Sequence, residues 1–311
     1  METADLRIAL FSGNYNYVRD GANQALNRLV DYLLRQGAQV RIYAPVVAEP
    51  AFEATGDLVG VGSLPIPGRA EYRVPLRVVG KALRNLEAFA ANVVHVSSPD
   101  PVGHQAVTWA RKHGLPVLAS VHTRFETYMR YYNMAWGEPV MEALLRRFYR
   151  RCDALVAPSE SMAQVLRDQR MNYDISIWSR GVDRKISAFV GFLQGSDLGR
   201  AVASMDVLFN PSVTETFGNV TLEVMACGLP VVAAAATGSQ SLVDDRNSGR
   251  LIPPGAIHQF AEALRAYIED PALRTAHGRA GEARASEFSW DKINQAVADT
   301  YIRLIRQKTR R

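Results

Sequence analysis

This chain contains little cysteine and no long hydrophobic run. The 311 residues include two cysteines, Cys152 and Cys227, which lie far apart and lack the spacing of a zinc site. Reduced thiols are typical of a cytoplasmic protein. No apolar run reaches the roughly 18 residues of a membrane-spanning helix, and the polar start Met1–Asp5 does not resemble a signal peptide. We therefore expect a cytoplasmic protein, with any membrane contact peripheral and on the inner face.

The chain also has no recognisable nucleic-acid-binding motif, so we expect no nucleic-acid partner. Its net charge is +5, with 36 Lys and Arg against 31 Asp and Glu, which favours anionic partners. Hydrophobic residues make up 48% of the chain, enough to form the cores of two domains.

Short apolar segments alternate with helical patterns along the first half. The alternation predicts an α/β fold with a doubly wound parallel sheet, whose strands are expected at residues 7–11, 40–44, 92–96, 116–121 and 154–157. Ligands bind such sheets at the carboxyl ends of the strands, which is where Ser12, Ser97, His122 and Ser159 fall. In the second half we expect strands near residues 188–192, 206–209, 231–234 and 249–252, and helices near 197–204, 257–270 and 290–306.

Residues 214–223 are the most informative segment. Glu215 and Glu223 stand eight positions apart, with Gly218 and the start of a predicted helix between them. Thr216 is expected to cap this helix, placing Glu223 about two turns inside it. The buried stripe of the helix would be Leu222, Met225, Ala226 and Leu229. Free backbone N–H groups at a helix N-terminus bind anions, so this segment predicts a pocket for a phosphorylated sugar.

This segment, with residues 210–212 before it and 225–232 after it, resembles the signature of retaining family-4 glycosyltransferases, which have the GT-B fold. The resemblance implies two Rossmann-like parallel-sheet lobes. Residues 1–184 would form the acceptor-side domain and residues 185–311 the nucleotide-sugar domain. A lone pair of glutamates would more simply belong to a capped helix with both carboxylates in solvent, but the whole run favours the family.

The resemblance also implies roles for individual residues. Glu215 would hold hydroxyls of the donor sugar and act as a catalytic residue, Glu223 would hold the ribose, and the backbone of Phe217–Asn219 would cradle the diphosphate. His122 matches the family's active-site histidine beside the reacting carbon, and Gly21 matches a glycine that faces the donor pocket. Taken alone, His122 would be a structural histidine after a buried strand, and Gly21 a plain turn.

The second half is short for this family. Only five residues separate Arg180–Asp183, which resembles the domain-junction motif, from the strand expected at Phe189. Relatives of this kind insert roughly 60–80 residues there, judged by the usual size of strand–helix units. The sequence has no match to the Arg…Glu-Lys element that clamps the donor diphosphate, and we assign that role to neither Arg184 nor Lys185. We therefore expect a reduced second lobe.

A basic helix is predicted at residues 141–151, where four arginines accompany Leu144, Leu145 and Phe148. Two interpretations remain open. The helix can rest on an anionic membrane surface, or it can be an ordinary domain helix whose arginines are paired or solvated.

The residues and the resemblance together favour a hexosyltransferase that acts with retention. The donor would be a GDP- or UDP-linked sugar, the acceptor a lipid or glycan hydroxyl, and no other cofactor is expected. No Asp-x-Asp element occurs, which favours a metal-free route. The motifs at 120–128 and 177–183 resemble the branch that contains GDP-mannose-dependent mannosyltransferases and sulfoquinovosyldiacylglycerol synthases. The alternatives are a catalytically impaired remnant that serves as a binding module and, less well matched, a GT-B epimerase.

Overall fold

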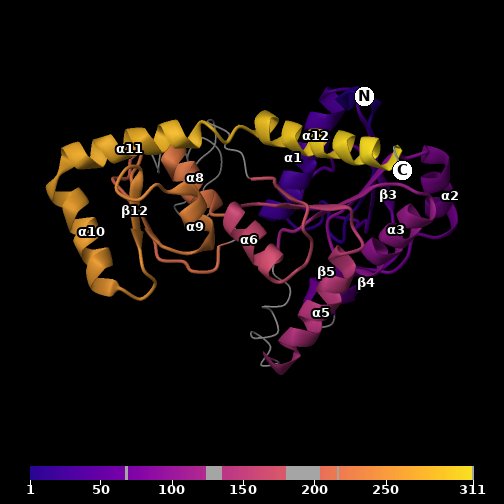
Figure 1. Cartoon of the computed structure of the whole chain (residues 1–311), viewed down its shortest axis with the longest axis horizontal. Coiled ribbons are helices and arrows are strands. Elements are labelled where there is room, and N and C mark those ends of the chain that lie inside the picture. The colour runs from indigo at the N-terminus through magenta and orange to yellow at the C-terminus, as the bar shows by residue number, and fades with distance from the viewer. Residues whose placement is uncertain (67–68, 124–134, 180–203, 216, 310–311) are drawn as a thin grey trace. The chain divides into compact units, whose positions relative to one another are not determined.

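The computed structural model describes residues 1–66, 69–123, 135–179, 204–215 and 217–309. The chain divides into two compact units, one of residues 1–157, 163–178 and 294–311, the other of residues 158–162 and 179–293. Each unit has its own parallel sheet (Figure 1). The prediction of two Rossmann-like parallel-sheet lobes is confirmed, and in the described residues the second sheet has three strands against seven in the first.

The first unit is built on the sheet β3-β2-β1-β6-β7-β8-β9, in which every neighbouring pair is parallel. All residues of β6, β7 and β8 are buried, as expected for central strands of a parallel sheet with both faces covered. The strands are β1 (Arg7–Phe11), β2 (Gln39–Ala44), β3 (Asp57–Gly60), β6 (Val93–Val96), β7 (Val117–Ser120), β8 (Ala154–Ala157) and β9 (Ile175–Ile177). The sequence patterns predicted five of them and missed the short outer strands β3 and β9.

Helices and one hairpin complete the first half of the chain. The helices are η1 (Thr3–Asp5), α1 (Gly21–Arg35), α2 (Gly80–Phe89), α3 (Pro101–Lys112), η3 (Ala135–Gly137), α5 (Glu138–Tyr149) and α6 (Glu160–Asp168). An antiparallel hairpin joins β4 (Ser63–Ile66) to β5 (Arg69–Pro75). The carboxylate of Asp20 caps α1 by accepting a hydrogen bond from the Asn23 N–H at 2.8 Å. The buried face of α1 includes Ala25, Leu26, Leu29, Val30 and Leu33.

The second unit has the parallel sheet β10-β11-β12 (Leu208–Asn210, Val231–Ala234 and Gly249–Ile252). Its helices are α8 (Asn219–Ala226), α9 (Thr237–Leu242), α10 (Ile257–Glu269) and α11 (Pro271–Ala285). The sequence patterns did not predict α9 or α11. The strand predicted at residues 188–192 lies outside the described residues, as does the helix predicted at 197–204 except for Ser204.

The closing helix α12 (Trp290–Thr309) changes the predicted division of the chain. The predicted second domain was residues 185–311, whereas the structure assigns residues 294–311 to the first unit. Within that unit Asn294 accepts a hydrogen bond from Trp178 Nε1 at 3.2 Å and donates one to the Arg28 carbonyl at 3.2 Å. The Tyr301 hydroxyl lies 2.5 Å from Nδ1 of His95 on β6. These buried contacts join the end of the chain to the first sheet. Within the described residues, no helix is both long enough and apolar enough to cross a bilayer.

Candidate functional site

Glu215 is held in place at the carboxyl edge of the second sheet. Asn210, the last residue of β10, donates a hydrogen bond from Nδ2 to Glu215 Oε1 at 3.0 Å. The same amide lies 3.3 Å from the hydroxyl of Thr221 on α8. The Glu215 carbonyl accepts a hydrogen bond from the Gly238 N–H on α9 at 3.0 Å. Both the side chain and the backbone of Glu215 are therefore fixed, as a ligand-binding carboxylate requires.

The helix after Glu215 begins later than predicted. Its N-cap residue is Gly218, which makes no side-chain capping bond and has a φ of 94°, a left-handed conformation that favours glycine. Thr216, the predicted cap, lies outside the described residues. Because α8 starts at Asn219, Glu223 is its fifth residue and lies one turn into the helix, a correction to the predicted two turns. The first N–H groups of α8 have no partner inside the helix, which gives this end an affinity for anions.

The side chain of Phe217 belongs to the core of the second unit. It is buried among Leu222, Met225 and Leu242, and its ring lies edge-on to Phe288 with centroids 6.0 Å apart. Only the backbone of Phe217 is therefore suited to contact a ligand. Gly238 packs directly against this backbone, since a Cβ there would lie 2.6 Å from the Phe217 carbonyl carbon. The sheet, α8 and α9 thus hold Glu215, Phe217 and Gly218 in place.

His122 lies in the first unit, just beyond β7. Its ring is edge-on to Trp178, with centroids 5.2 Å apart. Trp178 is buried, and its indole N–H donates to Asn294 on α12. No sequence pattern indicated that Trp178 supports His122, although the motif at 177–183 contains it. Nothing in the sequence pointed to Asn294 on α12, because its role depends on a contact with a residue 116 positions away along the chain.

Gly21 is the exposed first residue of α1, next to the capping residue Asp20. Near the carboxyl ends of β1 and β6, the Ser97 hydroxyl donates to the Ser12 hydroxyl at 2.9 Å. Asp100 caps α3 and accepts a hydrogen bond from the Ser98 hydroxyl at 2.5 Å, and burial raises the pKa of its carboxyl group. These contacts place polar groups at the carboxyl ends of the strands, where a parallel sheet is expected to bind a ligand.

The predicted site residues therefore fall into two sets. Glu215, Phe217, Gly218, Asn219 and Glu223 belong to the second unit, and His122 and Gly21 to the first. Two residues that sequence analysis did not assign to the site, Asn210 and Gly238, fix Glu215. The signal for Asn210 was present, since residues 210–212 precede the signature, whereas nothing near Gly238 pointed to it. Among the described residues, no group of three or more His, Cys, Asp or Glu side chains is arranged to hold a metal ion.

The arginines of the basic helix are mostly engaged with protein groups. Arg146 forms an ion pair with Glu142 on α5. Arg150 Nε donates to the Arg170 carbonyl at 3.0 Å, and a guanidinium nitrogen of Arg151 donates to the Thr108 hydroxyl at 2.6 Å. These three arginines fit the interpretation of a domain helix. Arg147 is exposed.

Comparisons with known proteins agree with this architecture. Residues 19–185 match Glycosyltransferase Family 4, and residues 167–270 match Glycosyl transferases group 1. The sulfoquinovosyl transferase of Arabidopsis thaliana is 23% identical, over 91% of this chain and 71% of that protein. A GDP-mannose-dependent alpha-mannosyltransferase of Mycobacterium tuberculosis is 24% identical, over 85% of this chain and 89% of that protein.

A solved structure shows the same fold. Sucrose-phosphate synthase from Thermosynechococcus elongatus superimposes with a TM-score of 0.76 at 17% sequence identity, and the match covers 96% of this chain and 99% of that structure. The first family match spans more than half of the 311 residues. The chain therefore belongs to glycosyltransferase family 4.

Proposed function

We propose that this chain transfers a hexose from a GDP- or UDP-linked sugar to a lipid or glycan hydroxyl, with retention at the anomeric carbon. Membership of glycosyltransferase family 4 and the names of the two sequence relatives support the reaction class. The observation that carries the proposal is that Glu215 and Phe217 lie just before the start of α8 and are held there by contacts with Asn210 and Gly238.

In this proposal each part of the segment has a distinct task. The Glu215 carboxylate accepts hydrogen bonds from hydroxyls of the donor sugar, and Glu223 accepts them from the ribose. The backbone N–H groups of Phe217–Asn219 face the diphosphate. A carboxylate already fixed by Asn210 loses little freedom when it binds a hydroxyl, so its bonds contribute more to affinity. No cofactor beyond the nucleotide sugar and no metal ion is part of the proposal.

The reacting sugar would pass through an oxocarbenium-like state while negative charge builds on the leaving diphosphate. The α8 dipole stabilises that charge, but its effect fades within about one turn. His122 would lie beside the reacting carbon, with its ring supported by Trp178. The sequence has no match to the family's Arg…Glu-Lys clamp, and fixed cations supply a few kcal/mol each. Turnover is therefore expected to be about four orders of magnitude below that of an enzyme with the clamp.

The missing clamp also supports a second candidate function, that of a module which binds a sugar nucleotide or an acceptor without turnover. Steady-state assays with GDP-mannose and UDP-glucose over a panel of lipid acceptors separate the two. Turnover in the usual range of roughly 1–1,000 per second would contradict the expected loss. Donor binding without any product would favour the binding module.

The donor site is tested directly by Glu215→Gln. Calorimetric titration should show a loss of about 1.5–3 kcal/mol in affinity for the sugar nucleotide, and almost none for the free nucleotide, because one charge-assisted bond to the sugar is removed. Glu262→Gln, an exposed change on α10, is the matched control. Equal losses for sugar nucleotide and nucleotide in the Glu215 variant would remove Glu215 from the sugar-binding role.

A peripheral contact with an anionic membrane is the second part of the proposal. Trp136, Val140 and Leu144 are 80%, 59% and 56% exposed; the spacing of four residues places Val140 and Leu144 on one face of α5, and Trp136 lies in η3 directly before that helix. Arg147 lies exposed one turn further along. An exposed apolar stripe next to a cation is the pattern of a helix that lies in the membrane interface. The apolar stripe, rather than the four arginines, would carry most of the binding.

Vesicle sedimentation with anionic and neutral lipids tests this surface. Changing Trp136, Val140 and Leu144 to serine should weaken binding to both lipids, because apolar area no longer enters the interface. Arg147→Gln should remove about 1 kcal/mol on anionic vesicles only, and salt should abolish that difference. The control changes Ile257 and Ile268, which are 78% and 73% exposed in the second unit, to serine. Unchanged binding by the stripe variant would refute the contact.

A further inference from the structure

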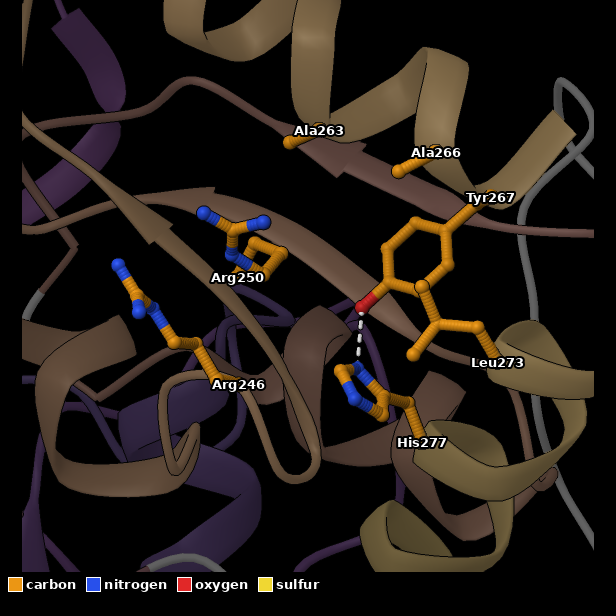
Figure 2. Close-up of a pocket in the computed structure, with 7 residues that line it drawn as sticks. All are labelled: Arg246, Arg250, Ala263, Ala266, Tyr267, Leu273 and His277. Atoms are coloured by element: carbon orange, nitrogen blue, oxygen red, sulfur yellow. Dashed lines mark hydrogen bonds between the residues drawn. The ribbon is translucent and has the colours of Figure 1, made fainter. Parts of the chain in front are cut away.

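The second unit contains a cavity of about 360 Å³ lined by β12, the turn before it, α10 and α11 (Figure 2). Ala263, Ala266 and Leu273 form an apolar part of its wall. The polar part consists of Arg246, Arg250, Tyr267 and His277. None of these residues belongs to the segment assigned to the sugar nucleotide. The cavity is about the size of a small-ligand site and combines an apolar wall with a few polar groups, as such sites do.

The cavity carries a net positive charge. Its two guanidinium groups come from Arg246 in the turn and Arg250 on β12, and the nearest carboxylate is that of Asp245. Nε of Arg246 and Nε of Arg250 lie 3.7 Å and 3.6 Å from Asp245 oxygens, too far for hydrogen bonds. Nε of Arg250 is buried, and the described residues provide no hydrogen-bond acceptor for it. A buried cationic donor in this situation calls for an acceptor from outside the chain.

The polar groups of the cavity are held by the fold. Arg246 has a φ of 64°, and its N–H donates to the Gly249 carbonyl at 2.8 Å, which closes the turn before β12. Across the cavity, the Tyr267 hydroxyl lies 2.7 Å from Nδ1 of His277, joining α10 to α11 (Figure 2). Non-glycine residues rarely adopt such a φ unless the surrounding structure maintains it. The arrangement is therefore formed before any ligand binds.

The two rings are hydrogen-bonded to each other and to the Arg246 backbone, and both are uncharged at neutral pH. Burial raises the pKa of Tyr267 to about 12, so its hydroxyl stays protonated at neutral pH. Burial and the charge of Arg250 lower the pKa of His277, against an opposing hydrogen bond to the Arg246 backbone. His277 is therefore neutral near pH 7, and the cavity's charge comes from its two arginines, offset in part by Asp245.

We propose that this cavity binds a small organic phosphate. Guanidinium groups match phosphate oxygens with paired, charge-assisted hydrogen bonds, and the exposed Arg246 side chain can close over an anion that Arg250 holds from within. The ring of Tyr267 and the apolar wall would contact the organic part of the ligand. This site is independent of the proposed glycosyl transfer, because it uses none of the donor-site residues.

The experiment is a titration of the full chain with phenyl phosphate at low ionic strength. Binding is measured by calorimetry and by NMR of the histidine side chains. The chain has six histidines, and His277→Gln identifies the resonance of interest. We expect the His277 resonance to shift saturably and its pKa to rise, since a bound anion favours the imidazolium. Arg250→Gln should weaken binding about tenfold or more. Arg279→Gln, an exposed change on α11, should leave it unchanged.

Other outcomes would overturn the proposal. A His277 resonance that does not move, or an equal loss of affinity in the Arg250 and Arg279 variants, would show that phenyl phosphate does not bind in this cavity. Benzoate binding as tightly as phenyl phosphate would refute the preference for phosphate. Glu215→Gln should leave phenyl phosphate binding at His277 intact, so failure of the donor site and failure of this site are distinguishable. Thermal unfolding of each variant confirms that the fold is retained.

Discussion

Gly238→Ala tests whether close packing between α9 and the backbone of Phe217 and Gly218 is required for donor binding. Gly238 is the second residue of α9. A Cβ there would lie 2.6 Å from the Phe217 carbonyl carbon, 2.7 Å from its oxygen and 3.0 Å from the Gly218 nitrogen. Because all three atoms belong to backbone, the contact cannot be relieved by turning a side chain. The backbone of Phe217 and Gly218 would have to move instead.

The magnitude follows from two opposing effects. Alanine in place of glycine favours a helix by up to about 1 kcal/mol, and less in the first turn. Overpacking against a fixed backbone costs about 1–3 kcal/mol. The second effect is the larger, so we expect a net loss of about 1–2 kcal/mol in the free energy of unfolding. Displacement of Glu215 should in addition weaken sugar-nucleotide affinity.

Gly281→Ala on α11 is the matched control. A Cβ at Gly281 would meet its nearest neighbour at 3.6 Å, an ordinary contact, so this variant should be more stable by about 0.5–1 kcal/mol. Urea unfolding and calorimetry with GDP-mannose and UDP-glucose measure both effects. A Gly238 variant that gains stability like the Gly281 variant and binds donors normally would refute the reasoning.

Three further predictions concern other contacts. Burial lowers the pKa of His95 to about 3. Below pH 6.5 only the unfolded chain takes up a proton at this residue, so the free energy of unfolding should fall by up to about 1.4 kcal/mol per pH unit. Urea unfolding of His95→Gln should show a shallower dependence of stability on pH. Gly278→Ala should cost more than about 3 kcal/mol in a thermal melt, because a Cβ would lie 2.0 Å from the Gly228 carbonyl oxygen. Asn210→Ala should weaken sugar-nucleotide affinity by roughly 1 kcal/mol in calorimetry, because Glu215 loses its anchor.

The strands and the donor motif were predictable from local sequence. Central strands such as Val93–Val96 are continuous apolar runs because both faces of a parallel sheet are covered. The glutamates on either side of Gly218 were recognisable because the run that contains them resembles the family signature and precedes a predicted helix start, although the N-cap of α8 is Gly218 and not the predicted Thr216. By contrast, α11 was missed because its buried face includes Gly278, Gly281 and Ala285, which do not form a strong apolar stripe.

The sequence by itself determined the central strands, the helix after Gly218 and the family that the signature resembles, because those properties depend on residues close together in the chain. Only the tertiary structure decided that α12 joins the first unit, that Asn210 and Gly238 fix Glu215, and that Arg250 faces Tyr267 and His277 across a cavity. Each of these depends on contacts between elements that are separate in sequence. Such contacts are set by which buried faces pack together, and short-range patterns do not encode that choice.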